Sequence, residues 1–422
     1  MHLSKTLLWV LAAGLLLAIV AGVLVITETR VPRSLVMATG PEGSSYALYA
    51  EQYRQLLEQS GVVVELRSSG GTVENLQLLD DPAAHVDVAF VSAGTTSAEK
   101  SRELRTLGTV FMEAAWFFAH EADLEATGLD GLRGKRIAIG TEGSITRAMA
   151  ETILKLNRFD ASSADFRYLS SKAAGDELRR GELEAAFIMS SADLPTVREL
   201  LADPAIDLVS FPRAAAYVAL YPYLTRLTVP EGVGDLALNR PAHDVSIFGA
   251  PVSLVVRADM PASLQALLLR AASQIHGGPG MFNAAGRFPA AEAVDLPLSD
   301  GAIQYYKSGT PLLQRYLPFG LAVFVEGLLY VLLPVIGVVY PVLQFAPSAY
   351  VWLMRQRIIN VYGELKLLEH ELDSEPDDAR KLVLLERLDQ LDRRVVRMHI
   401  PVSYAQLVYT LRQHISLVRS RA

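Results

Sequence analysis

Short loops of glycine and hydroxyl residues follow apolar stretches at several places in this chain. The segment from Met37 to Leu57 reads MATGPEGSSYALYAEQYRQLL, in which an apolar run passes into glycines and serines and then into a helical pattern. A helix that begins in such a loop presents free backbone N–H groups and hydroxyls, which suit an anionic or polar ligand. The same loop is equally compatible with a helix N-cap that binds nothing.

Four loops of this kind follow predicted strands. The residues that we expect to face a ligand from these loops are Thr39, Gly40, Gly43, Ser44, Ser45 and Tyr46, then Ser69, Gly70, Gly71 and Thr72, then Ser92, and finally Gly143, Ser144, Ile145 and Thr146. Glycine permits close approach of the backbone, hydroxyls add donors, and helix N-termini favour negative charge. A single loop is more often a plain strand–helix turn, but four at equivalent places favour a binding cleft.

A bound anion also calls for a local cation, because the central part of the chain is acidic. We expect Arg147, which follows GSIT in the first turn of a predicted helix, to supply it. Arg67 and Lys172 are weaker candidates, and each is at least as compatible with a solvated surface position. Tyr217, in AAAYVALYPYLTRLTVP, is a candidate for lining or covering the cleft, although single aromatics are more often core residues.

Sequence motifs of catalysis and of metal binding are missing. GLRGKR lacks the spacing and the Ser/Thr of a phosphate-binding P-loop, and neither G-x-S-x-G nor H-E-x-x-H occurs. The absence of cysteine excludes disulfides, thiolate metal sites and cysteine nucleophiles. A triad assembled from distant residues stays open. We expect no enzyme, no catalytic residue, no metal site and no cofactor, and the net charge of −7 argues against nucleic acid as a partner.

Two segments are apolar enough to predict membrane helices. Residues 6–27 contain no charge, residues 318–345 contain only Glu326, and a bilayer is spanned by about 20 apolar residues. We expect a transmembrane signal-anchor in residues 1–27, with a cleaved signal peptide as the alternative, and a second span in residues 316–350. Arg355 and Arg357 place the chain after the second span in the cytoplasm, because positive residues favour that side.

The remaining elements divide the chain into a mixed domain and a helical tail. Strand-like runs alternate with helical patterns in residues 28–315, and VMATGPEGSSYALYAEQY echoes IAIGTEGSITRAMAETIL. This pattern predicts an α/β domain with two facing lobes, lobe 1 in about 35–130 and 245–303 and lobe 2 in about 135–235. Ligands bind such sheets at the carboxyl ends of the strands. Leucines at spacings of three and four predict a helical hairpin in residues 351–422, either self-packed or binding a partner.

The motifs together resemble the TAXI family, the TRAP-transporter-associated extracytoplasmic solute receptors. The segments that carry the resemblance, over about residues 35–303, include the Thr39–Tyr46 loop, SSGGTVENLQLL, VDVAFVSAG, LRGKRIAIGTEGSITRAMAETIL, LRRGELEAAFIM and YPYLTRLTVP. The resemblance implies a type II periplasmic-binding-protein fold, a ligand such as glutamate or a dicarboxylate, and delivery to TRAP permease subunits. The chain departs from the family pattern at Ala38 and Pro41-Glu42, where glycines are common, and at Ser92, where a glutamine is frequent.

The sequence therefore predicts a solute-binding protein of the bacterial inner membrane. Its binding domain lies on the periplasmic side, its tail lies in the cytoplasm, and it captures a small organic acid or an amino acid by closing its cleft, for a TRAP-type transporter. The alternative is a sensor or scaffold that relays ligand binding through the second membrane helix to the tail.

Overall fold

The computed structural model describes residues 34–120, 128–374, 376–398 and 404–421. The chain divides into two compact units, the first ending at Gly327 and the second beginning at Leu328. The anchor predicted in residues 1–27 lies outside the described residues. The predicted α/β architecture is confirmed in the first unit.

A mixed ten-stranded sheet forms the centre of the first unit, in the order β2-β1-β3-β10-β4-β7-β5-β6, with β8 paired to β4 and β9 paired to β10. The strands are β1 (Ser34–Ala38), β2 (Val63–Arg67), β3 (Val88–Ser92), β4 (Leu104–Ala119), β5 (Arg136–Ala138), β6 (Asp165–Arg167), β7 (Ala185–Ser190), β8 (Asp207–Leu208), β9 (Thr225–Val229) and β10 (Val245–Arg257). Strands β1, β2 and β3 are parallel, as are β5, β6 and β7. Strands β3 and β7 are buried along their whole length, as expected for strands covered on both faces.

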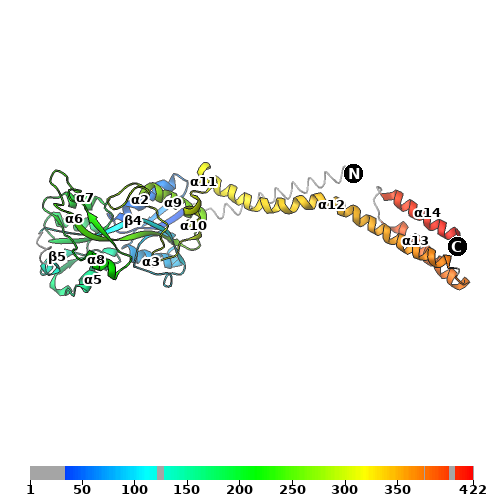
Figure 1. Ribbon diagram of the computed structural model, residues 1–422, viewed down its shortest axis with the longest axis horizontal. Helices are drawn as coiled ribbons and strands as arrows, with labels where there is room; N and C mark the ends of the chain where they lie inside the picture. The colour runs from blue at the N-terminus through cyan, green and yellow to red at the C-terminus, as the bar shows by residue number, and fades with distance from the viewer. Residues whose placement is uncertain (1–33, 121–127, 375, 399–403, 422) are drawn as a thin grey trace. The chain divides into compact units, whose positions relative to one another are not determined.

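The helices of this unit gather at the two ends of the sheet. Figure 1 shows α2, α3 and α9 at one end and α5 to α8 at the other. The helices are α2 (Ser45–Glu58), α3 (Thr72–Asp80), α5 (Ile145–Leu156), α6 (Ser171–Arg179), α7 (Pro195–Ala202), α8 (Ala214–Leu220), α9 (Ala262–His276), α10 (Asp300–Ser308) and α11 (Leu312–Tyr316), with short 3-10 turns at η1 (Pro82–Ala84), η2 (Gly128–Leu132) and η3 (Ala161–Ser163). We call the part around β1–β3 lobe 1 and the part around β5–β7 lobe 2.

Two long strands, β4 and β10, run through both lobes. They pair antiparallel with each other, and each contributes to two separate hydrophobic cores. Their lobe 1 halves supply side chains such as Phe111 and Leu254, and their lobe 2 halves supply side chains such as Trp116 and Phe248. The sequence pattern assigned no element to β4, so these crossing strands are a finding of the structure.

The second unit is helical. It contains α12 (Phe319–Asp373) from Leu328 onward, together with α13 (Asp378–Arg397) and α14 (Ala405–Arg421). Its core combines Leu365 of α12, Leu388 of α13 and Ile415 of α14 with their neighbours, so three helices share one core where the sequence predicted a hairpin of two. The reason is that the apolar positions of α14, which the two-helix pattern left out, complete the core.

No helix in the described part of the chain combines the length and the apolar character needed to cross a membrane. The second span expected in residues 316–350 is therefore not supported. These residues belong to the end of α11 and to the first part of α12.

Candidate binding cleft

Four helices of the first unit begin at one cavity. Their N-cap residues are Ser44 of α2, Gly71 of α3, Ser144 of α5 and Ser170 of α6, and all four line it. The cavity is small in this structure, with a volume of about 40 Å³. Helix N-termini carry unpaired N–H groups and a partial positive charge, so the cavity favours a negatively charged or polar group.

The two lobes build this edge in the same way. Ser44 and Ser144 both have extended backbone, and their hydroxyls accept hydrogen bonds from the N–H groups three residues later, at 3.3 Å and 3.2 Å. Gly43 and Gly143 precede them with φ near +77° and +75°, a conformation that glycine adopts without strain. The repeated Gly-x-x-Gly-Ser sequence therefore produces the same turn in both lobes.

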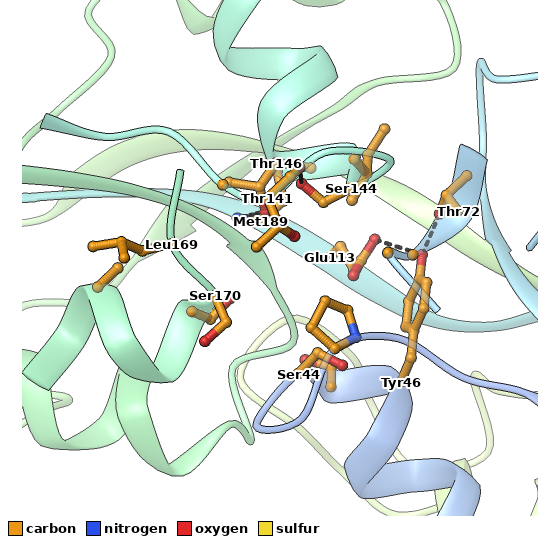
Figure 2. A pocket seen from close by; sticks show the side chains of 18 of the residues that line it. Ser44, Tyr46, Thr72, Glu113, Thr141, Ser144, Thr146, Leu169, Ser170 and Met189 are labelled. Carbon is orange, nitrogen blue, oxygen red and sulfur yellow. Dashed lines mark hydrogen bonds between the residues drawn. The ribbon is translucent and has the colours of Figure 1, made fainter. Parts of the chain in front are cut away.

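The cavity contains a buried acid. Glu113 of β4 lines it with 3% of its surface exposed, and Tyr46 Oη donates a hydrogen bond of 3.0 Å to Glu113 Oε2 (Figure 2). The hydroxyls of Tyr46 and Thr72 lie 2.7 Å apart, so Thr72 helps to position the tyrosine that binds the acid. Burial raises the pKa of Glu113 to about 8, against which the hydrogen bond from Tyr46 acts only in part. Glu113 is thus mainly protonated at neutral pH.

Glu113 lies where β4 passes from one lobe to the other. It pairs with Ala250 of β10, and the next residue, Ala114, begins the pairing of β4 with Ser190 of β7. The acid therefore stands at the junction of the two cores and lines the cavity.

Direct contacts join the two lobes around the cavity. Ser45 Oγ accepts a hydrogen bond of 2.9 Å from the backbone N–H of Ser191, and Tyr49 Oη donates one of 3.2 Å to Asp193 Oδ2. Residues of lobe 1 thus bind residues of lobe 2 directly, so the structure shows the lobes closed on each other.

Comparison with known proteins assigns the chain to a family. Residues 37–308, more than half of the chain, match the sequence model described as the NMT1-like family. The chain belongs to the NMT1-like family. The match does not test the resemblance to the TAXI family, which stays a prediction.

Solved structures similar to this NMT1-like chain include a histidine kinase sensor domain with similarity to periplasmic binding proteins. It is 18% identical, with 58% of this chain and 90% of the other covered and a TM-score of 0.35. An amino acid ABC transporter substrate-binding protein from Streptococcus pneumoniae, bound to L-arginine, is 14% identical, with 57% and 88% covered and a TM-score of 0.35. A periplasmic transporter is 13% identical, with 71% and 96% covered and a TM-score of 0.40.

About half of the residues predicted from the sequence line the cavity of the NMT1-like domain. These are Ser44, Ser45, Tyr46, Gly70, Gly71, Thr72, Ser144, Ile145 and Thr146. The others lie outside the lining: Thr39, Gly40, Gly43, Ser69, Ser92, Gly143, Arg147 and Tyr217. Several of these support it, since Ser69 Oγ, for example, donates a hydrogen bond of 2.9 Å to the carbonyl of Thr39.

Arg147, which the sequence predicts as the cation for the ligand, is not among the residues that line the cavity. Its guanidinium binds Glu151 at 2.8 Å and stacks over the ring of Tyr168, because its place in the first turn of α5 directs the side chain along the helix surface. Tyr217 instead accepts a hydrogen bond of 2.7 Å from Asn157 and packs against Phe248 in the lobe 2 core. In the described part of the chain, no Lys or Arg lines the cavity.

The structure adds cavity residues that sequence reasoning missed. They are Pro41, Glu113, Gly140, Thr141, Leu169, Ser170, Ser171, Ala174, Phe187 and Met189. The Ser170-Ser171 pair follows β6 and begins α6, so the strand–serine–helix signal used for the other loops could have found it. Glu113, an isolated acid in an apolar run, offered a weaker signal.

Proposed function

We propose that this protein is an extracytoplasmic solute-binding protein that captures a small organic anion by closing its two lobes. The ligand classes that we favour are dicarboxylates and amino acids such as glutamate. The observation that carries the proposal is the meeting of four helix N-termini, two from each lobe, at one cavity between hydrogen-bonded lobes. Membership of the NMT1-like family supports it.

Ligand capture follows from the geometry. In the closed form, residues of both lobes line the cavity, so a ligand there contacts lobe 1 and lobe 2 together. Contacts that exist only in the closed form stabilise that form, which shifts the equilibrium from open to closed. The activity that we propose is binding without turnover, in the periplasm. The proposed partner is a TRAP-type permease, which receives the ligand. Residues 1–27 are the segment that we propose as the membrane attachment.

The experiment is a binding screen with the purified full-length chain. Thermal unfolding is measured with succinate, L-glutamate and putrescine, and dissociation constants are then determined by calorimetry for each probe that raises the melting temperature. A ligand that binds the folded state raises stability with the logarithm of its concentration over its dissociation constant. We expect succinate or L-glutamate to stabilise the protein. Absence of binding by all three probes would contradict the proposal.

A second candidate function is ligand sensing or scaffolding. The observation that favours it is the second unit, residues 328–422, which has its own core of three helices and which ligand capture alone does not require. Limited proteolysis with and without a bound ligand tests it. A ligand-dependent change in cleavage within α13 or α14 supports sensing, and an unchanged pattern there favours transport.

A further inference from the structure

We propose that Glu113 sets the ligand class of the cleft by acting as a neutral carboxylic acid, which donates a hydrogen bond to a carboxylate of the ligand, so that an organic anion and a proton bind together. The inference rests on the proposed function and names the chemistry of the same site. The proton comes from solvent and stays on the Glu113 carboxyl group while the anion is bound, and no covalent bond changes.

The geometry directs the acid at the ligand. Figure 2 shows Glu113 between Tyr46 of lobe 1 and the Thr141–Ser144 loop of lobe 2, with its carboxyl group facing the cavity. Tyr46 donates to Oε2, so Oε2 serves as the acceptor oxygen and Oε1 carries the proton. A neutral acid in this position is a donor in a cavity whose lining includes the N-cap residues of four helices.

Charge decides between an anionic and a cationic ligand. An ionised Glu113 would suit a ligand ammonium group, but the four helix N-termini around the cavity oppose a positive charge. A ligand carboxylate suits the N-termini and would be repelled by an ionised Glu113, since two like charges that share a buried site cannot both persist. Protonation removes this repulsion and turns the acid into a donor. The site therefore accommodates a carboxylate without any cationic side chain in its lining.

Two titratable neighbours, Tyr46 and His276, each keep one protonation state near neutral pH, where Glu113 titrates. On α2, burial raises the pKa of Tyr46 well above its ordinary value, so its hydroxyl stays protonated. On α9, burial lowers the pKa of His276 to about 3, so its ring, which packs on Phe111, stays neutral. On α3, Glu74 Oε2 accepts a hydrogen bond of 2.6 Å from the N–H of Gly70. On the paired strand β10, the residue opposite Glu113 is alanine.

The test measures succinate binding to the full-length chain by calorimetry at pH 7 and pH 9, in two buffers that differ in ionisation enthalpy. Because the pKa of Glu113 is about 8, we expect the dissociation constant to be about tenfold higher at pH 9 than at pH 7, with uptake of close to one proton per ligand at pH 9. Glu113→Gln, whose amide is a permanent donor, should bind succinate equally at both pH values. Glu65→Gln, an exposed acid on β2, is the matched control and should behave like the wild type.

Several outcomes would overturn the inference. Succinate affinity that is independent of pH, or higher at pH 9, would do so, as would loss of succinate binding in a folded Glu113→Gln variant. Preferential binding of putrescine at pH 9 would assign the ionised acid to a ligand ammonium instead. In these cases a ligand still binds, so the proposed function stands while the role of Glu113 falls. If succinate, L-glutamate and putrescine all fail to bind at either pH, the proposed function fails and the inference fails with it.

Discussion

Gly70 of lobe 1 lies against the backbone carbonyl of Glu142 in lobe 2, so closely that a Cβ atom at residue 70 would come within 2.5 Å of the carbonyl oxygen. Three residues later, the N–H of Val73 donates a hydrogen bond of 3.1 Å to the carbonyl of Gly143. The loops that begin α3 and α5 therefore meet backbone to backbone. The lobes can approach this far because residue 70 has no side chain.

Gly70→Ala should weaken ligand binding by obstructing closure. The added methyl group would collide with a backbone atom, which cannot move aside as a flexible side chain can, so the closed form should lose stability relative to the open form. We expect the dissociation constant for succinate or L-glutamate to rise about tenfold or more, because a ligand held by both lobes depends on the closed population. Calorimetry on the full-length chain measures it.

The control for this variant is Gly278→Ala, at a glycine of the same unit where a Cβ atom meets nothing within 4 Å. It should bind like the wild type. Equal affinity of Gly70→Ala and wild type would mean that the bound state does not use the contact between residues 70 and 142.

Glu113→Gln should change how the stability of the protein depends on pH. The pKa of Glu113 rises from an ordinary 4.5 to about 8 on folding, so between these values the native state holds a proton that the unfolded state has lost. Its contribution to stability is full below pH 4.5 and is lost as pH rises to 8, by up to roughly 5 kcal/mol. Glu113→Gln has no titrating group at this position, so its stability does not fall for this reason. We expect the difference in melting temperature, variant minus wild type, to grow from pH 5 to pH 8.

Thermal unfolding of both proteins across this range measures the difference. A constant difference between pH 5 and pH 8 would show that Glu113 has an ordinary pKa in the folded protein. Glu65→Gln, whose acid is exposed, serves again as the control and should show no such trend.

His276→Phe should make the protein more resistant to acid. His276 is buried in an aromatic cluster with Tyr49, Tyr53 and Phe111, and its Nε2 has no hydrogen-bond partner. Burial lowers its pKa from 6.5 to about 3. The stability that the neutral ring contributes is therefore present above pH 6.5 and lost as pH falls toward 3, because the unfolded state gains a proton first. At pH 4.5 this loss amounts to roughly 3 kcal/mol at most.

Denaturant unfolding at pH 7 and pH 4.5 tests this effect, by comparing the free energy of unfolding of the variant with that of the wild type. Both proteins contain Glu113, so its contribution cancels in the difference. We expect His276→Phe to lose less stability than the wild type on acidification. An equal loss in both proteins would assign the acid sensitivity to other groups. A phenylalanine fits here because it keeps the ring contacts and removes an unpaired polar atom.

The parts of the fold that the sequence predicted depend on local patterns. The strand–loop–helix units β1–α2 and β5–α5 each carry a strand, a glycine turn and a serine cap within a few residues of one another. Strand β4 carries no such signal. Its apolar run is continuous, and the strand acquires its place only by pairing with β10, more than a hundred residues later.

Some residues of the candidate site could likewise be predicted from local sequence patterns, and others could not. Ser44 and Ser144 were predictable, because an N-cap is a local structure with a local sequence signal. Glu113 reaches the cavity through the register of β4 against β10 and β7, which sequence spacing does not encode. The third helix of the second unit, α14, was missed because its apolar positions, such as Leu411, gain meaning only when they pack on α12 and α13.

Arg147→Ala tests whether this cation contributes to ligand binding. The side chain pairs with Glu151 one helical turn away and covers the ring of Tyr168, and it does not line the cavity. We expect succinate affinity to stay within about twofold of wild type, and stability to fall by roughly 0.5 kcal/mol, as is usual for such a pair on a helix surface. A loss of affinity of tenfold or more would restore Arg147 as the ligand's counter-ion, and the helix N-termini with the protonated Glu113 would no longer suffice to hold an anion.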